Sequence, residues 1–215
     1  MNKNLRALLR GIIAGVMISL GGCIYLVLEN KMLGAFLFSI GLFSICVNGY
    51  NLYTGKIGYV IDNEPKYLLE LLFTLIGNLL GTVACGYLLF LSRIGDKLRN
   101  AAISICTIKL NDNLLSIYIL SIFCGIIMYL AVDMYKKVDG FGRYVGIFMG
   151  ITVFILAGFE HCVANMYYFS MANMWEWKTI LYVIVMILGN TTGSILLALG
   201  NKYGLEKWKQ KWLFL

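Results

Sequence analysis

The sequence is poor in charged residues, in proline and in histidine. Only 13% of its 215 residues are Asp, Glu, Lys or Arg, which is about half the share that soluble domains carry. Because 60% of the residues are hydrophobic and the mean hydropathy is +0.79, the chain lacks the polar surface of a soluble globule. The composition therefore excludes an ordinary soluble domain and indicates a membrane protein.

Histidine and paired cysteines are scarce, which excludes most metal sites. His161 is the only histidine, and the six cysteines stand singly with no CxxC pair. Five of these cysteines fall within apolar stretches, where a thiol serves as a small packing group. We therefore expect no disulfide framework, no metal and no cofactor.

Six apolar stretches have the length of transmembrane helices, which need about 20 residues each. The first follows basic residues, as the core of a signal peptide does, but it is long and has no convincing cleavage site. The sequence thus predicts one all-α transmembrane domain over residues 1–215. Its six spans are Leu8–Leu28, Met32–Tyr53, Tyr67–Leu91, Leu114–Val132, Tyr144–Tyr168 and Thr179–Leu199.

The distribution of basic residues predicts that both termini are cytoplasmic. Most Lys and Arg residues lie in the terminal segments and in the second and fourth loops, although Arg93, Lys97, Arg99 and Lys109 crowd the third loop. The net charge of +7 is attributed to topology and lipid headgroups, so membrane lipids and no nucleic acid are the expected partners. Residues 204–215 are expected to form an amphipathic tail on the cytoplasmic surface.

An internal repeat relates the two halves of the chain. The pentad GNLLG at residues 77–81 recurs as GNTTG at residues 189–193, which is 112 residues further on. Two halves with three spans each, approximately 1–100 and 101–203, must have opposite orientations in the membrane, as in many transporters and channels. Glycines four residues apart let helices approach closely, and Asn78 and Asn190 are expected to bond across them. Direct contact with a substrate is the alternative role for these asparagines.

The middle span of each half is interrupted by polar residues and glycines. The second span runs into NGYNLYTGK, which includes Gly55, and the fifth has Gly158 just before Glu160 and His161. Irregular backbone at membrane depth is tolerated where protein buries it or where it lines a polar cavity. We expect both interruptions to face one interior path.

Two blocks resemble the formate/nitrite transporter family, whose known members include formate, nitrite and hydrosulfide channels. The block GFEHCVANM at residues 158–166 is similar to the family's fifth-helix signature almost throughout, and LFSICVNGYNLYTGK at residues 42–56 is similar to its second-helix signature. The family's second-helix signature usually ends in a small residue, an acid and then Leu-Phe-Thr-Gly-Asn, and the second block departs from it at Tyr50, Asn51, Tyr53 and Lys56.

The resemblance implies an aquaporin-like protomer with six transmembrane helices in an inverted 3+3 repeat, the second and fifth helices broken. It also implies a homo-pentamer in the cytoplasmic membrane, with one pore in each protomer. The implied function is a channel, and not an enzyme, for a small monovalent anion of a weak acid, such as formate, nitrite or hydrosulfide, together with protons.

The resemblance also assigns positions along the pore. Thr54 and His161 are expected to lie between two constrictions. The cytoplasmic constriction is expected from Leu52, Phe154 and Phe38, and the outer one from Leu42 and Met128.

A lysine and a glycine complete the family comparison. Lys109 lies fifteen residues before Cys124, which matches the spacing of a family lysine that leans toward the central histidine. A lysine that anchors the chain at the lipid headgroups is the alternative. Gly125 stands where the family has asparagine, so one polar group near the pore is missing.

The chemistry expected at the interruption centres on His161. Its side chain is the only one whose unperturbed pKa lies between about 5 and 8, so it is a candidate to meet the anion with a proton. A buried histidine satisfied by Asn165 or by a backbone carbonyl is the alternative. Asn165 is expected beside the pore, while Glu160 and Gly158 are expected to hold the interruption in shape.

Other classes of membrane protein fit less well. A water or glycerol channel of aquaporin type, the alternative function, needs Asn-Pro-Ala at both interruptions, whereas the only proline is Pro65. An enzyme would need a nucleophile and a base side by side, and His161 and Cys162 diverge by about 100° if they are neighbours on a helix. A scaffold protein has no reason to interrupt two related spans around ionisable groups.

Overall fold

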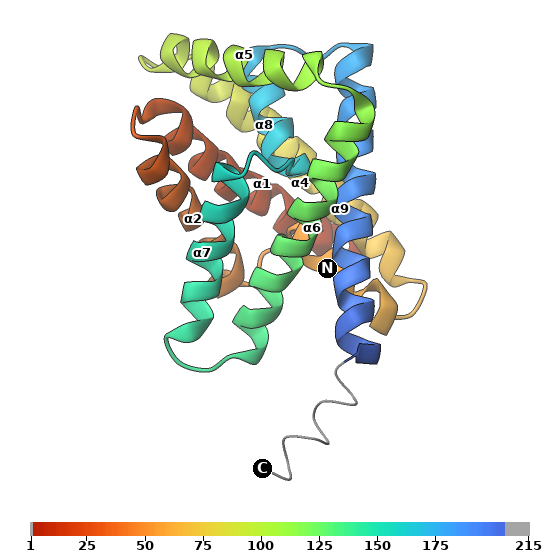
Figure 1. Ribbon diagram of the computed structural model, residues 1–215. Coiled ribbons are helices and arrows are strands. Elements are labelled where there is room, and N and C mark those ends of the chain that lie inside the picture. Colours follow the sequence, from red (N-terminus) through yellow and green to blue (C-terminus); the bar gives the residue numbers. More distant parts are fainter. Residues whose placement is uncertain (1, 205–215) are drawn as a thin grey trace.

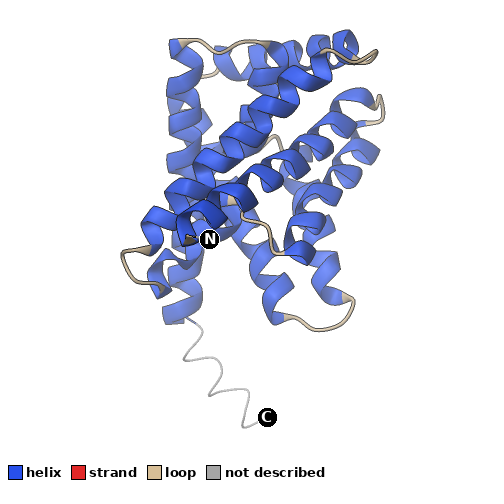
Figure 2. Ribbon diagram, turned by 180° about the vertical axis from the view of Figure 1, so that it is seen from behind, coloured by secondary structure: helices blue, strands red, loops and turns tan. Residues whose placement is uncertain are grey.

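The computed structural model describes residues 2–204, and within them every regular element is helical (Figures 1 and 2). The expected C-terminal tail lies outside the described residues, except for Gly204. The elements are α1 (Lys3–Val27), α2 (Lys31–Asn48), α3 (Tyr53–Lys56), the 3₁₀ helix η1 (Ile57–Asp62), α4 (Tyr67–Phe90), α5 (Gly95–Asn111), α6 (Leu114–Lys137), α7 (Gly142–Leu156), α8 (Cys162–Ala172) and α9 (Trp177–Gly204).

Five of these helices are long and apolar enough to cross a membrane, namely α1, α2, α4, α6 and α9. The stretch 144–168, expected as the fifth span, is divided between α7 and α8. These helices have 15 and 11 residues, or about 22 and 16 Å at 1.5 Å per residue, so neither reaches across a hydrocarbon core of about 30 Å. The long helices point to an integral membrane protein whose interior contains shorter helical pieces.

Corresponding helices of the two halves pack in the same way. In the first half α1 packs against α4 and α2, and in the second half α6 packs against α9 and α7, while α2 and α7 join the halves. The pentads lie in the first of these contacts. A Cβ atom at Gly81 would collide with the Ile12 carbonyl oxygen on α1, and one at Gly193 would collide with the Ile122 carbonyl oxygen on α6. The glycines of both pentads thus let backbones touch, as small residues do in membrane helix pairs.

Helix α5 runs across one end of the molecule, whereas α9 runs along it (Figure 1). The charged segment between the third and fourth spans was expected to be a loop, but residues 95–111 are helical and pack their buried side chains against α8. We call this end the α5 face. The α6–α7 connection and the end of α9 lie at the opposite face (Figures 1 and 2).

The close glycine contact between α6 and α9 can be tested with a single methyl group. We expect Gly193→Ala to lower the free energy of unfolding by about 1–3 kcal/mol, because the added carbon forces the two backbones apart. Thermal unfolding of the detergent-solubilised protein measures the change. Gly200→Ala on the same helix is the matched control, since no atom lies within 4 Å of the Cβ position there. Equal effects of the two substitutions would contradict the packing role.

Candidate transport site

A left-handed glycine begins each interruption. Gly49 follows α2 with φ +66°, and Gly158 follows α7 with φ +72°, a backbone conformation that glycine adopts without steric cost. The chain then runs without helical structure to Leu52 in the first interruption and to His161 in the second, where α3 and α8 begin. Of the two glycines in this segment, Gly49 makes the turn, whereas Gly55, expected to be structural at the first interruption, lies inside the short helix α3.

Asn78 of the first pentad binds the backbone of the first interruption on both sides of Leu52. Its Oδ1 accepts a hydrogen bond from the Tyr53 N–H (2.9 Å), and its Nδ2 donates to the Asn51 carbonyl (2.9 Å). The same Nδ2 donates to the Gly11 carbonyl on α1 (2.9 Å). One fully buried amide thus supplies partners for backbone groups that the missing helical turn leaves open.

Asn190 of the second pentad makes the corresponding set of bonds. Its Oδ1 accepts from the Cys162 N–H (2.9 Å), and its Nδ2 donates to the carbonyls of Glu160 (2.7 Å) and of Ser121 on α6 (2.8 Å). Each of these three bonds has a counterpart at Asn78: an N–H and a carbonyl two residues apart in the interruption, and a carbonyl on the first long helix of the same half. The bonds of both asparagines therefore reach further than the expected contact between two helices, because each also secures an interruption.

Thr54 and His161 meet between the two interruptions. Thr54 Oγ1 lies 2.8 Å from His161 Nε2, and both side chains are buried. His161 is also the N-cap of α8, because its Nδ1 accepts a hydrogen bond from the Ala164 N–H (3.0 Å). An Nδ1 that accepts carries no proton, so the neutral ring has its proton on Nε2 and donates to Thr54. The hydroxyl proton of Thr54 is then available for another acceptor.

An ion pair between a partly buried lysine and a buried glutamate lies beside the histidine. Lys109 Nζ donates to Glu160 Oε2 (2.6 Å), and Asn165 Nδ2 donates to the same oxygen (2.7 Å) and to the His161 carbonyl (3.1 Å). Lys109 thus contacts Glu160 rather than the imidazole toward which the family lysine leans. Glu160 binds side chains and not the N–H groups of the interruption. Asn165 Oδ1 is buried without a hydrogen-bond partner in the described part of the chain.

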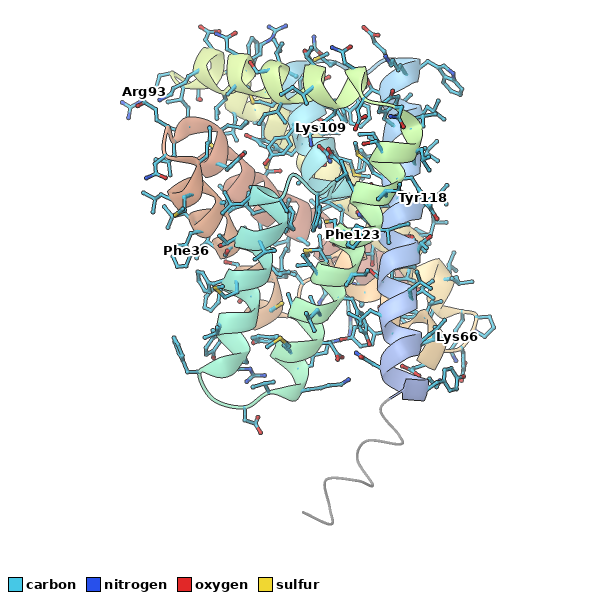
Figure 3. All side chains as sticks on the ribbon, in the orientation of Figure 1. Phe36, Lys66, Arg93, Lys109, Tyr118 and Phe123 are labelled. Carbon is cyan, nitrogen blue, oxygen red and sulfur yellow. The ribbon has the colours of Figure 1, made fainter. Side chains whose placement is uncertain are left out.

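Two pockets approach the Thr54–His161 pair from opposite ends. A pocket of about 160 Å³ lies beneath α5, near Lys109 (Figure 3), and Phe154, His161 and Asn165 line it. A second pocket, of about 370 Å³, lies on the other side of the Thr54–His161 pair, and Leu42, Leu52 and Lys56 are among its lining residues. Lys136, near the end of α6, places the mouth of the second pocket at the face opposite α5.

This arrangement corrects the expected grouping of the constrictions. Phe154 lies on the α5 side with its ring edge-on to Phe38 (centroids 6.2 Å apart), whereas Leu42 and Leu52 line the same pocket on the other side. Met128 is fully buried and lines neither pocket. Positions along the sequence did not reveal which of these side chains line the same pocket. The reason is that the interruption turns the chain between Leu42 and Leu52.

One further contact was not expected from the sequence. The Tyr53 hydroxyl lies 2.8 Å from Thr191 Oγ1, so the first interruption is also tied to α9 of the other half. Tyr53 had been noted only as a departure from the family pattern. The polar pair TT inside the second pentad was the one available signal for such a partner.

The long apolar helices, together with one pocket that His161 lines and a second that Leu52 and Gly55 line on either side of Thr54, are features of a polytopic membrane transport protein. A model of the formate/nitrite transporter family matches residues 2–203, and the chain belongs to this family.

Individual relatives agree with this assignment. The chain is 27% identical over 237 residues to a formate-nitrite transporter of Plasmodium knowlesi (91% of this chain and 75% of the relative). It is 26% identical over 191 residues to the nitrite transporter NirC of Escherichia coli (79% and 70%). Its fold is similar to that of a pentameric formate channel solved with formate bound, with a TM-score of 0.74, 22% identity and coverage of 98% and 97%.

The role of Asn190 can be tested by removing its amide. We expect Asn190→Ala to lower the free energy of unfolding by several kcal/mol, because it leaves the Glu160 carbonyl and the Cys162 N–H buried without partners at about 1–3 kcal/mol each. Thermal unfolding in detergent provides the measurement. The control is Asn48→Ala, since among residues 2–204 the exposed Asn48 amide binds only the Ser44 carbonyl of its own helix. A small effect of Asn190→Ala, equal to that of the control, would show that the interruption does not need this amide.

Proposed function

We propose that this protein is a channel for small monovalent anions of weak acids, such as formate, nitrite or hydrosulfide, with flux that depends on pH through His161. The names of its relatives, which include nitrite and formate carriers, support this substrate class. We further propose an inverted 3+3 repeat assembled as a homo-pentamer in the cytoplasmic membrane, with both termini cytoplasmic and one pore in each protomer. The matching bonds of Asn78 and Asn190 support the repeat, and the pentameric formate channel of similar fold supports the assembly.

The observation that carries the proposal is the pair of pockets on either side of Thr54 and His161. Apolar side chains are part of the lining of each pocket, with Phe154 on one side and Leu52 on the other. An anion that passes such side chains must lose water, which is costly for a localised charge in a low dielectric. The path therefore suits a solute that is attracted as an anion and crosses the centre as a neutral acid.

The α5 side of the path provides the attraction. Lys109 lines the pocket, and its ammonium already has Glu160 as a partner, so it draws an anion without being an uncompensated buried charge. Asn165 lines the same pocket and holds Glu160 in place. Farther in, the Thr54 hydroxyl can donate its proton to the solute while its oxygen accepts from His161.

Proton transfer at His161 has a structural requirement. Nε2 of the neutral ring already carries the proton that is donated to Thr54, so an added proton must bind Nδ1. Protonation of Nδ1 displaces the Ala164 N–H and removes the cap of α8. The imidazole can therefore relay a proton to the solute only while the first turn of α8 loosens, which links protonation to a local movement.

The substitution His161→Asn separates the ring from the cap. Asparagine is a good N-cap, so α8 should remain folded while the titratable imidazole is lost. We expect formate flux to fall by about tenfold or more and to lose its dependence on pH, in line with removal of a group that transfers protons. Flux into proteoliposomes with formate, nitrite and hydrosulfide, at about pH 5 and about pH 7, measures both effects.

Two results of this experiment would contradict the proposal. Unchanged pH dependence in His161→Asn would show that His161 serves only as a cap and hydrogen-bond donor. Water or glycerol permeability in the unsubstituted protein without flux of any of these anions would favour a neutral-solute channel.

The attraction by Lys109 has its own test. We expect Lys109→Gln to raise the half-saturating formate concentration on the α5 face by about tenfold, because it removes the cation that lines that pocket, and to leave Glu160 as a buried charge. Lys97→Gln is the control, since Lys97 is exposed on the same helix. If both substitutions change the half-saturating concentration equally, surface charge and not the pocket lysine attracts the anion.

A further inference from the structure

The pocket at the face opposite α5 is lined by three cations and by no carboxylate. Arg10, Lys56 and Lys136 come from α1, α3 and α6, and they share a pocket of about 370 Å³. Within residues 2–204, Arg10 forms no ion pair with a carboxylate, and the Lys136 ammonium lies over the Tyr59 ring, 3.5 Å from its centroid. The pocket therefore has an excess of positive charge on its walls.

The nearby carboxylates are already engaged elsewhere. Glu70 is shared between Lys56 (2.7 Å) and Lys3 (3.3 Å), and Asp133 accepts from Lys137 (2.7 Å) and from the Tyr59 hydroxyl (3.3 Å). Neither acid lines the pocket. The protein's own acids thus leave the positive charge of this pocket incompletely balanced.

Lys56 ties this pocket to the first interruption. Its ammonium donates to Glu70 Oε1 on α4 (2.7 Å) and to Asn51 Oδ1 within the interruption (3.2 Å). The Lys56 side chain is 26% exposed, whereas that of Glu70 is 13% exposed. An ammonium has three N–H donors, and Asn51, Glu70 and the Tyr67 ring (5.9 Å to its centroid) already surround this one, so an anion in the pocket competes with them for it. Asn51 directly precedes Leu52, which lines the inner part of the same pocket.

We propose that this pocket is an anion-binding site in which a small monovalent anion competes with Asn51 and Glu70 for the Lys56 ammonium. The proposal rests on the proposed function, because the anion is the transported solute. An anion that binds Lys56, with Arg10 and Lys136 on the pocket walls, weakens the bond to Asn51 and frees the segment that carries Leu52. Arrival of the solute thereby loosens the apolar constriction in front of it. Lys56 stands where the family signature has asparagine, so this site is a feature of the present chain.

Competition and simple structural support predict opposite results for two substitutions. If the anion competes with Glu70 for Lys56, Lys56→Gln weakens anion entry and Glu70→Gln strengthens it. If the Lys56–Glu70 pair only holds the fold together, both substitutions weaken transport in the same direction, at both faces.

The experiment measures formate flux into proteoliposomes with the protein in one defined orientation, with entry from each face in turn. At the face opposite α5 we expect Lys56→Gln to raise the half-saturating concentration by about tenfold, as loss of one charge-assisted hydrogen bond implies. Glu70→Gln should lower it, and Lys56→Arg should restore a value near that of the unsubstituted protein. Entry from the α5 face should change little. The control is Lys66→Gln on the same face (Figure 3), where Lys66 pairs with the exposed Glu64.

The outcomes separate the site from the channel. Flux in the unsubstituted protein, combined with equal half-saturating concentrations for Lys56→Gln, Glu70→Gln and Lys66→Gln, would overturn the site and leave the channel intact. Absence of flux in the unsubstituted protein would overturn the proposed function.

In that case a binding experiment on the purified protein still tests the site. Binding of isotope-labelled formate is followed by the line broadening of the formate signal in solution, and Lys56→Gln must reduce this binding. If Lys56→Gln fails to fold, the contrast between Lys56→Arg and Glu70→Gln decides the question.

Discussion

In hydrocarbon, every backbone N–H and C=O must find its partner within the protein, and this constraint governs the structure around its centre. Two helices stop at left-handed glycines, and each stop leaves backbone groups without the next helical turn. Asn78 and Asn190 supply the missing partners and at the same time bind α1 and α6. The close approach of α1 to α4, and of α6 to α9, follows from the pentad glycines, and it brings each amide within reach of its interruption. Without these two amides, the Tyr53 and Cys162 N–H groups and the Asn51 and Glu160 carbonyls would lose these partners inside the protein.

The same constraint gives one polar side chain at the centre two roles. A short helix that begins inside the molecule needs a cap, and for α8 the cap is the only histidine of the chain. One side chain therefore serves structure through Nδ1 and faces the path through Nε2. The two faces of the path differ in how charge is arranged. On the α5 side a partly buried lysine pairs with a buried glutamate beside the histidine, whereas on the other side three cations line a larger pocket.

The sequence predicted the family and the all-helical, apolar character of the chain, because blocks such as GFEHCVANM carry their signal in consecutive positions. It did not predict the contacts that join distant positions. The pentads were recognised as a repeat, but nothing in their local pattern indicates that Asn78 reaches Asn51 and Tyr53. Gly49 and Gly55 stand in one polar segment, and composition alone does not tell which of them adopts positive φ.

Family spacing could assign Lys109 to the neighbourhood of residues 160 and 161. Adjacent side chains point in different directions, however, and the bond goes to Glu160. Helix α5 was missed because its charged residues are typical of a loop between two spans.

The partners of the two asparagines also bear on how the protein is made. All three bonds of Asn78 lie within residues 11–78, and all three bonds of Asn190 lie within residues 121–190. Each half can therefore complete its own interruption soon after the helix that carries its pentad, α4 or α9, enters the membrane, without waiting for the other half. The bonds Thr54–His161 and Tyr53–Thr191, in contrast, require both halves. The most local part of the architecture can thus assemble during synthesis, and the polar centre forms only when the two finished halves dock.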